Sequence, residues 1–440
     1  MPSFINLQLG WPSPSLFPTS QILSGATNIL QSQEKVASAL IYGPDAGYEP
    51  LRRNIASWLS SSYSLSDATT AERICVTNGA SASLHNILAK FSEPGYTRRI
   101  WMIEPSYFLA CPIFADNGFE GRLRGVPEDD EGLDIEFLRN AIAQVETDTS
   151  HPSSPNLKTS TTSGKTMSLR RRQQIVRLAR EFDALVITDD VYDVLRWPEI
   201  EGEDQDKLGT IPPRIVDVDR MLDGGPKDEW GNAASNGSFS KIIAPGVRTG
   251  WVEGTPKFVL SLSELGANKS GGCPSHLTAT FIDEMLASGQ LQTHIKDVLI
   301  PTYRSRYYAL RKAIQDHLVP LGFHTTTSIP YDESFGSDVE SNRECVAVAG
   351  GYFTYVRVPD DLPISPERLA ALSLEECNMK FAFGAMMAVE GDKSSVERGE
   401  QGFSRAIRLC WAWHSEKEII EGIKRLATLV KEMHAGKHRE

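Results

Sequence analysis

The sequence predicts an α/β protein that has a large domain with a mostly parallel sheet flanked by helices, and a smaller α+β domain. Three observations lead to this prediction. Strand-like and helix-like runs alternate between residues 73 and 254, half-exposed alternating runs follow near residues 350 and 404, and an amphipathic run closes the chain. Strand–helix alternation is typical of parallel sheets covered by helices, whereas strands that alternate apolar and polar residues are typical of antiparallel sheets.

The large domain is expected to contain short apolar strands, each bounded by turn residues, with amphipathic helices between them. The run RICVTNG, for example, stops at a glycine, and ALVITDDVY is an apolar run that ends in acids. In chain order the expected elements are strand 73–79, helix 80–91, strand 98–106, helix 168–182, strand 184–192, and strands 233–240 and 249–254.

The smaller domain is expected to follow a helical stretch that leads away from the sheet, at 277–317. Strands are expected at 350–359 and 404–413, with a helix at 416–434 beside them. The predicted division is an N-terminal arm at 1–50 that is part of the small domain, the large domain at 51–300 and the small C-terminal domain at 301–440, with loops or linkers at 146–166, 200–213 and 326–345.

The composition limits the classes of function. The chain has 440 residues and a net charge of −12, which argues against general binding to nucleic acids or anionic membranes. Six cysteines without a CxxC pair or a Cys/His cluster favour reduced thiols in an intracellular protein without a metal centre. No signal peptide pattern and no apolar run near the ~20 residues of a membrane span are present. We therefore expect a cytoplasmic protein.

Candidate ligand-binding residues follow the first two expected strands, where parallel α/β sheets bind their ligands. Asn78-Gly79-Ala80-Ser81 opens a helix and could offer backbone N–H groups to a phosphate, or it could be a simple turn. Tyr107 follows the second strand and could stack on a flat ligand or pack in the core.

Two adjacent acids, Asp189 and Asp190, end the run 184–192, and the phenol of Tyr192 follows. The acids could bind Mg²⁺, act as acid and base, or pair with a cationic ring nitrogen. Solvation or helix capping is the alternative for either acid.

The stretch SNGSFSKIIAPGVRTGW (235–251) contains two cations and no acid. Ser238 and Arg248 could face a phosphate, because the planar guanidinium fork matches phosphate geometry. Lys241, partly desolvated near another cation, would have a lowered pKa and could form a Schiff base. Together with the preceding turn, aromatic, carboxylate and phenol, these residues describe a site for pyridoxal 5′-phosphate.

With these residues in place, the chain resembles the class I and II aminotransferases, which are fold-type I pyridoxal-phosphate enzymes. Within them it is similar to the aromatic and 2-aminoadipate (kynurenine aminotransferase-like) subgroup. The resemblance implies an aminotransferase that moves an amino group from an aromatic or 2-aminoadipate-like amino acid to a 2-oxo acid. The same residues would also support a β-lyase, a decarboxylase or a biosynthetic cyclising enzyme. A non-catalytic protein of the same fold that acts by binding is a further alternative, which the unusual segment 146–166 motivates. The motifs are GYEPLR, TNGASASL, EPSYFLA, TDDVYDVL, SNGSFSKIIAPGVRTGW, GGYF and RAIRLCWAW.

The resemblance also implies roles for the residues around the cofactor ring. Lys241 matches the Schiff-base lysine, which also moves the substrate proton. Asp189 matches the carboxylate that keeps the pyridine nitrogen protonated. Tyr192 matches the phenol that hydrogen-bonds the ring oxygen, and Tyr107 matches the stacking aromatic.

Further roles are implied at the phosphate and substrate ends. The residues that match the phosphate cup are Ala80, Ser81, Ser238 and Arg248. Tyr42 matches a tyrosine that reaches the phosphate from the other subunit, which implies a homodimer. Arg408 matches the arginine that grips the substrate α-carboxylate, and alternation in AIRLCWAW places it opposite its apolar neighbours. Candidates for lining a large pocket are Trp11, Tyr352 and Phe353.

One segment departs from the family pattern. The family has an apolar strand that ends in NP-[ST]-G before the helix whose start reads MSLRRR here (167–172). This chain has Thr161 and Thr162 where the asparagine and proline are expected, and 144–160 contains no apolar run. Asn156 is a candidate for a displaced asparagine. Three explanations stay open, namely a divergent active site, a strand built from unpromising residues, and a gene model that lost a stretch.

Overall fold

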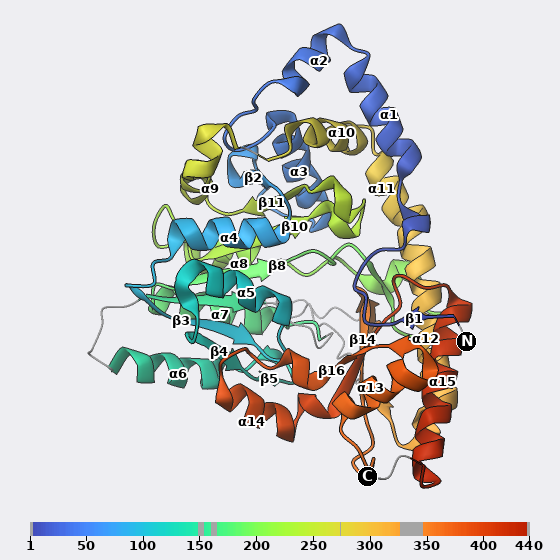
Figure 1. Cartoon of the computed structure of the whole chain (residues 1–440). Helices are drawn as coiled ribbons and strands as arrows, with labels where there is room; N and C mark the ends of the chain where they lie inside the picture. Colours follow the sequence, from blue (N-terminus) through green and yellow to red (C-terminus); the bar gives the residue numbers. More distant parts are fainter. Residues whose placement is uncertain (1–2, 148–153, 160–164, 273, 326–345, 438–440) are drawn as a thin grey trace.

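A seven-stranded sheet forms the centre of the computed structural model (Figure 1). The structure describes residues 3–147, 154–159, 165–272, 274–325 and 346–437. All strands of this sheet are parallel except β11, which is antiparallel to both its neighbours, so the predicted mostly parallel α/β sheet is confirmed. In spatial order the strands are β2 (Ile74–Thr77), β11 (Gly250–Glu253), β10 (Ala233–Ser238), β8 (Leu185–Asp189), β7 (Ser154–Thr159), β3 (Thr97–Ile103) and β4 (Leu123–Val126).

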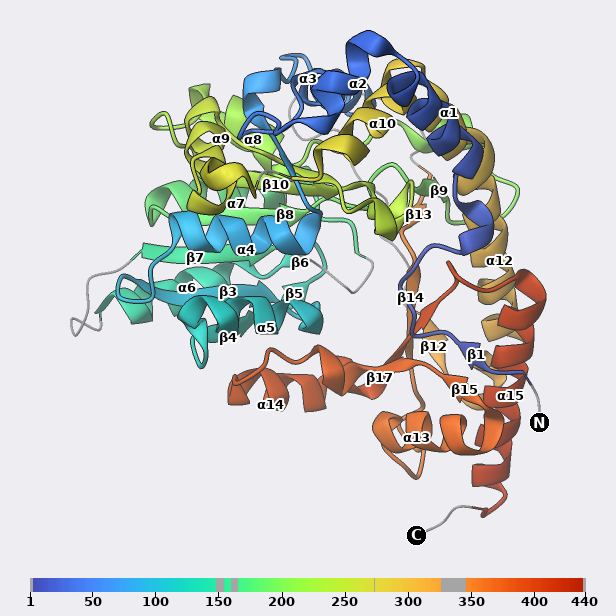
Figure 2. The same cartoon turned by 45° about the horizontal axis from the view of Figure 1, so that its top comes forward.

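Helices cover both faces of this sheet (Figure 2). Because successive side chains of a strand point to opposite faces, Ile187 packs on one face and Val186 on the other. The same alternation sends the adjacent residues Asp189 and Asp190 to different faces. The helices are α4 (Ala80–Phe91), α5 (Cys111–Phe114) and α9 (Pro256–Ser263) on the Ile187 face, and α6 (Ile135–Thr147), α7 (Leu169–Glu181) and α8 (Ile215–Met221) on the Val186 face.

A four-stranded antiparallel sheet lies beside the large one and contains the two alternating runs predicted near residues 350 and 404. The N-terminal arm adds strand β1 (Ile5–Asn6), which pairs with β15 (Met379–Lys380). The predicted domain boundaries near residues 50 and 300 stay a prediction. The sheet order is β12 (His324–Thr325), β14 (Phe353–Arg357), β17 (Ala406–Cys410) and β16 (Ala382–Phe383), and the helices of this part are α12 (Ile300–His317), α13 (Pro366–Cys377), α14 (Lys393–Gln401) and α15 (Glu416–His434).

The remaining elements surround the two sheets. Helix α1 packs on α10, and α2 lies at the outer tip of the molecule (Figure 1). Their bounds are α1 (Thr19–Leu30), α2 (Gln33–Leu40), α3 (Glu49–Ser62), α10 (His276–Ala287) and α11 (Gln290–His294). There are also two small antiparallel sheets of two strands each, β5 (Glu128–Asp129) with β6 (Gly132–Leu133) and β9 (Arg196–Pro198) with β13 (Val348–Gly350).

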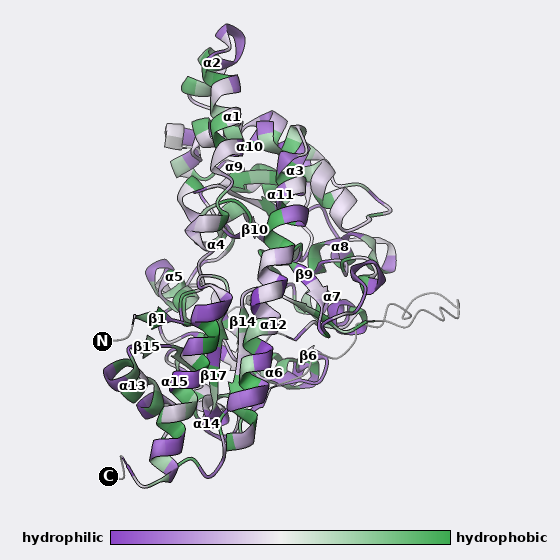
Figure 3. Cartoon of the chain, turned by 90° about the vertical axis from the view of Figure 1, so that its right-hand side faces the viewer, coloured by the Kyte–Doolittle hydropathy of each residue, from purple (hydrophilic) through white to green (hydrophobic). Residues whose placement is uncertain are grey.

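Helix ends follow local signals in the sequence. Helix α4 has the predicted bounds 80–91, and α15 has the predicted bounds 416–434. At the start of α15, Ser415 and Glu418 form a capping box that satisfies two free backbone N–H groups. Hydrophobic and hydrophilic residues are mixed along α12 and α15 (Figure 3). Within the described ranges, no helix combines the length and the apolar character that a membrane crossing needs.

Strand β7 corrects the prediction that all of 146–166 is a loop or linker. Residues Ser154–Thr159 lie between β3 and β8 and run parallel to both, with Asn156 paired to Ile100 and Leu185. The prediction was wrong because SPNLKT has no apolar run to indicate a strand. The strand forms because backbone hydrogen bonds to its two neighbouring strands satisfy its backbone N–H and C=O groups. The strand built from unpromising residues is therefore the explanation that the structure matches. Thr161, Thr162 and most of the predicted loop 326–345 lie outside the described residues.

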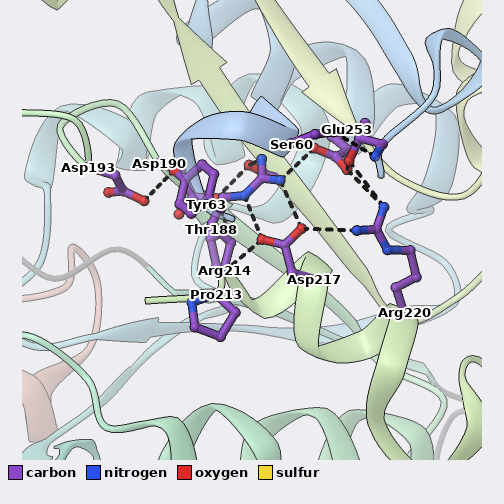
Figure 4. Close-up of polar contacts among 12 residues, drawn as sticks. Ser60, Tyr63, Thr188, Asp190, Asp193, Pro213, Arg214, Asp217, Arg220 and Glu253 are labelled. Carbon is purple, nitrogen blue, oxygen red and sulfur yellow. Dashed lines mark hydrogen bonds and ion pairs between the residues drawn. The ribbon is translucent and has the colours of Figure 1, made fainter. Parts of the chain in front are cut away.

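A buried ionic cluster joins the large sheet to the helices beside it (Figure 4). Arg214, just before α8, pairs with Asp217 (2.9 Å) and with Glu253 of β11 (2.8 Å). Its guanidinium carbon also lies 4.4 Å from the ring centre of Tyr63, which follows α3. All three charged side chains are fully buried, so the ion pairs with their partners must compensate for the hydration that each side chain loses. The cluster thereby holds β11, α3 and α8 together behind the strand ends.

Candidate active site

A cavity of about 800 Å³ lies where β3, β8 and β10 end, between the large sheet, the N-terminal arm and the small sheet. Parallel sheets bind ligands at this edge because their carboxyl ends meet there. All predicted site residues except Tyr42 line this cavity, namely Ala80, Ser81, Tyr107, Asp189, Tyr192, Ser238, Lys241, Arg248 and Arg408.

Lys241 lies in the short turn that follows β10 and points into the cavity. Its Nζ donates a hydrogen bond to the carbonyl oxygen of Gly10 (2.8 Å). Within the described parts of the chain, no carboxylate forms an ion pair with it. Burial, together with the charge of Arg408, lowers the pKa of Lys241 to about 8. The amine is therefore more often neutral, and more nucleophilic, than an exposed lysine at the same pH.

Tyr352 supports the backbone of that lysine. Its hydroxyl donates to the carbonyl oxygen of Lys241 (2.8 Å) and lies 3.1 Å from the hydroxyl of Tyr303. Its ring centre is 5.0 Å from that of Tyr192. Tyr352 was predicted only as a candidate pocket wall. It does line the cavity, but its hydroxyl is committed to the lysine turn.

The start of α4 and Arg248 lie together at one end of the cavity. Arg248 Nη2 donates to the carbonyl oxygen of Asn78 (2.8 Å), and Nη1 donates to that of Pro245 (2.8 Å). Gly79 precedes α4 with φ +98°, and a Cβ at this position would lie 2.6 Å from Arg248 Nη2. Free backbone N–H groups at a helix start and a guanidinium beside them suit a phosphate. Only a glycine at position 79 allows this approach.

We expect Gly79→Ala to weaken the binding of pyridoxal phosphate by about 10-fold or more, because the strained backbone and the displaced guanidinium add their costs. Equilibrium dialysis of the apoprotein with the cofactor measures the effect. Gly246→Ala is the matched control, since a Cβ there meets open space. Equal affinities in the two variants would contradict this assignment of the phosphate end.

The two adjacent acids have different surroundings. Asp189 lies on the α4 face, and its Oδ1 accepts a hydrogen bond from Asn236 Nδ2 (2.6 Å). Asp190 lies on the opposite face, and its Oδ2 accepts from Thr188 (2.7 Å) and Ser235 (2.5 Å), beside the ionic cluster of Figure 4. Asp189 is thus the acid that shares the α4 face and lines the cavity together with the start of α4.

Asp190 is expected to make stability depend on pH. Burial, and then the neighbouring carboxylate of Asp193, raise the pKa of Asp190 to about 7. Since the folded pKa is the higher one, the favourable protonated form is lost as pH rises through about 7. Asp190→Asn should therefore gain stability relative to the wild type between pH 5 and pH 8, by roughly 2–4 kcal/mol.

Urea unfolding of both proteins at the two pH values measures this gain. Asp361→Asn, at an exposed position, should show no such change. A difference between Asp190→Asn and the wild type that stays constant with pH would show that Asp190 is already ionised in the native state.

Arg408 is a buried cation on β17 with only 5% of its surface exposed. Its guanidinium carbon lies 4.1 Å from the ring centre of Phe353 on the neighbouring strand. Within the described ranges, no carboxylate pairs with it, and its Nε is buried without a hydrogen-bond partner. A buried cation without a partner is costly, so a carboxylate from a substrate would satisfy it.

Aromatic side chains form much of the remaining wall. Burial raises the pKa of the phenols of Tyr107 and Tyr192, so both stay protonated and able to donate. Trp11 from the N-terminal arm packs edge-on against Trp413 at 6.2 Å but remains 55% exposed. Trp11 and Phe353, both predicted as pocket residues, line the cavity.

Tyr42 is the predicted site residue that lies elsewhere. It follows α2, is 83% exposed and lies near Gly271, where an added Cβ would be 3.1 Å from the Tyr42 ring. It does not line the cavity of its own chain, within the described residues.

Two contacts of cavity-lining residues, Asp189 with Asn236 and Lys241 with Gly10, were not predicted from the sequence. The motif around Lys241 gives Asn236 no role, although strand alternation from Ser238 would have placed it on the α4 face of the sheet. Gly10 contacts Lys241 across 231 positions of sequence, and no local pattern indicates that contact.

The residues around the cavity fit the cofactor that the resemblance implies. A desolvated lysine, a carboxylate and an arginine beside a helix start match its aldehyde, its ring nitrogen and its phosphate. Arg408, which has no acid partner in the described part of the chain, remains available for a substrate carboxylate.

Comparison with known proteins agrees with this geometry. The family model described as aminotransferase class I and II matches residues 19–331. The uncharacterized protein YER152C of Saccharomyces cerevisiae is 30% identical over 429 residues, covering 89% of this chain and 90% of that protein. Aromatic-amino-acid aminotransferase 1 of Thermococcus litoralis is 27% identical over 436 residues, covering 97% of this chain and 88% of that protein. The crystal structure of Pyrococcus horikoshii kynurenine aminotransferase with PMP is 26% identical, has a TM-score of 0.76, and covers 98% of this chain and 92% of that one.

Proposed function

Because this chain belongs to the class I and II aminotransferases and is a pyridoxal-phosphate-dependent transaminase, we propose that its donor is an aromatic or 2-aminoadipate-like amino acid. We further propose that a 2-oxo acid accepts the amino group and that Lys241 is the residue that bonds the cofactor. The observation that carries the proposal is that one cavity contains both the desolvated Lys241 and the buried Arg408, neither of which has an acid partner among the described residues.

The proposed roles follow from the positions of the side chains. Pyridoxal phosphate supplies an aldehyde for the amino group and a cationic ring that draws electrons from the α-carbon. The Nζ of Lys241 takes the α-proton and returns it, since a pKa near 8 allows both steps close to neutral pH. When the cofactor is bound, Asp189 would hold the proton on the ring nitrogen, and Tyr192 would donate a hydrogen bond to the ring oxygen.

The walls of the cavity support the proposed substrate class. Arg408 would bind the α-carboxylate and so orient the bond that breaks. Trp11, Tyr107 and Phe353 offer flat apolar surface to a large side chain. Relatives named as aromatic-amino-acid and kynurenine aminotransferases support the same class.

The tip of the molecule supports the proposal of a homodimer. Helices α1 and α2 and the two residues Ile41 and Tyr42 that follow α2 carry exposed apolar side chains, and Figure 3 shows hydrophobic residues along both helices. A second copy of the chain would cover them and bring Tyr42 to the phosphate end of the neighbouring site. A cytoplasmic location stays a prediction. The exposed residues are Leu23, Leu30, Leu40, Ile41 and Tyr42.

Mixing two inactive variants tests this shared site. We expect Tyr42→Ala and Lys241→Ala chains, unfolded and refolded together, to regain activity, because one site of each mixed dimer is intact. Mixing Lys241→Ala with Arg408→Leu should regain none, since both side chains line the same cavity. No recovery in the first mixture, with mixed dimers present, would contradict the role of Tyr42.

The proposed reaction is tested with purified holoenzyme and a panel of amino acids. Conversion of the cofactor absorbance to that of pyridoxamine phosphate, followed by its regeneration with 2-oxoglutarate, is the expected result for aromatic donors and for 2-aminoadipate. Gas release, or pyruvate formation without pyridoxamine phosphate, would instead indicate a decarboxylase or a β-lyase. A protein without any absorbance band for bound cofactor would contradict a catalytic function.

A further inference from the structure

We propose that Asn236 is a positioning residue of the cofactor site, whose side-chain amide fixes both the carboxylate of Asp189 and the first residue of α4. The inference rests on the proposed role of Asp189. Asn236 lies on β10, an interior strand of the large sheet, and its side chain has no surface exposed to solvent.

Asn236 lies directly beside Asp189 in the sheet. The two residues are paired in the parallel register of β10 and β8. Asn236 Nδ2 donates one hydrogen bond to Asp189 Oδ1 (2.6 Å) and another to the carbonyl oxygen of Ala80 (3.0 Å). Its backbone carbonyl also accepts from the N–H of Asp190 (3.0 Å). One residue therefore holds the end of β8 through its main chain and its side chain.

The orientation of the amide is determined by its partners. Both atoms near Nδ2 are oxygens that can only accept, provided that Asp189 is ionised. A flipped amide would place Oδ1 of Asn236 beside the oxygens of Asp189 and Ala80, where no hydrogen bond could form. In the present orientation Oδ1 is buried without a hydrogen-bond partner, within the described residues. An unmade hydrogen bond at a buried oxygen costs free energy. The two hydrogen bonds that Nδ2 donates offset this cost.

The two donated bonds connect opposite ends of the proposed site. An amide N–H that donates to a carboxylate stabilises its charge and its direction. The bond to Ala80 attaches the same side chain to the start of α4, where Arg248 also lies. Asn236 thus fixes the distance between the carboxylate of Asp189, which would meet the ring nitrogen, and the start of α4, which would meet the phosphate.

Ser235, the residue before Asn236, forms a hydrogen bond with Asp190, the acid after Asp189. Ser235 points to the other face of β10 and donates to Asp190 (2.5 Å). Each of the two acids at the end of β8 therefore has its own donor on β10. The asparagine is matched to the acid on the cofactor face, where a change in carboxylate direction would affect binding.

Four variants test the proposal through cofactor affinity, measured by equilibrium dialysis of the apoproteins across a range of pH. Asn236→Leu keeps the volume but removes both donors. Asn236→Asp keeps the shape but places a second carboxylate beside Asp189. Asp189→Asn tests the acid itself. Asn232→Ala, just before β10, is the control, because it removes a half-buried amide that donates to Ala184 away from the cavity.

We expect Asn236→Leu to bind pyridoxal phosphate about 10- to 100-fold more weakly at all pH values, since it loses a charge-assisted hydrogen bond. Asn236→Asp should lose affinity most at high pH and recover it in part at low pH, because two adjacent carboxylates can share one proton. Asn232→Ala should bind as the wild type does. The pH-dependent loss is a result that simple destabilisation would not produce.

Wild-type affinity in Asn236→Leu would overturn the proposal, and so would an equal loss in Asn232→Ala. If Asn236→Leu fails to fold, a pH-independent affinity in Asn236→Asp would overturn it. The result for Asp189→Asn distinguishes a failure of the role proposed for Asn236 from a failure of the role proposed for Asp189. Weakened binding in Asp189→Asn alone would remove the role of Asn236 and leave the proposed function in place, whereas unchanged binding would remove the role of Asp189 itself.

Discussion

Lys241→Ala is expected to lower the rate of transamination by about 10⁴-fold or more while the chain remains folded. The substitution removes the only proposed nucleophile and proton carrier of the site. Its structural cost is small, because among the described residues the Nζ donates only one hydrogen bond, to the carbonyl oxygen of Gly10. Steady-state kinetics with an aromatic amino acid and 2-oxoglutarate measure the loss, and thermal unfolding measures the stability.

The absorbance spectrum gives an independent readout of the same substitution. The band of the lysine-bound cofactor should disappear in Lys241→Ala, even if free cofactor still enters the cavity. Lys257→Ala, on the exposed surface of α9, should retain both the band and the activity. Turnover in Lys241→Ala near the wild-type rate would require another residue to carry the proton.

Arg408→Leu is expected to lower kcat/KM for the amino acid by roughly 10²- to 10³-fold, mainly through KM. The guanidinium is buried on Phe353 and has no acid partner among the described residues, so a substrate carboxylate would be its first ionic contact. The same lack of a partner predicts that the free energy of unfolding changes by no more than about 1 kcal/mol, since no ion pair is broken.

Kinetics and urea unfolding together separate binding from folding for this residue. Arg408→Lys should be intermediate, because it keeps the charge but not the planar fork. The affinity for pyridoxal phosphate should change little in either variant. A large loss of stability with an unchanged KM would mean that Arg408 serves the core of the small sheet instead of the substrate.

Local patterns were sufficient to predict many elements and the main charged and phenolic side chains that line the site. Helices α4 and α15 have their predicted ends because capping residues and apolar periodicity act within a few positions. The strand ends at Thr77, Asp189 and Ser238 fall inside predicted strand runs, so their polar neighbours were expected to gather. Strand β7 could not be predicted in the same way. Its residues have no apolar run, and its place in the sheet depends on neighbours far away in the chain.

The sequence by itself determined the family, the cofactor and the residue types that surround the cavity, because motifs such as SNGSFSKIIAPGVRTGW are local. Only the tertiary structure decided which of two adjacent acids shares a face with α4, and that Asn236 donates to it. It also decided that the N-terminal arm contacts Lys241 and that Arg408 rests on an aromatic ring. The physical reason is that hydrogen bonds between distant segments depend on strand register and packing, which no short stretch of sequence specifies.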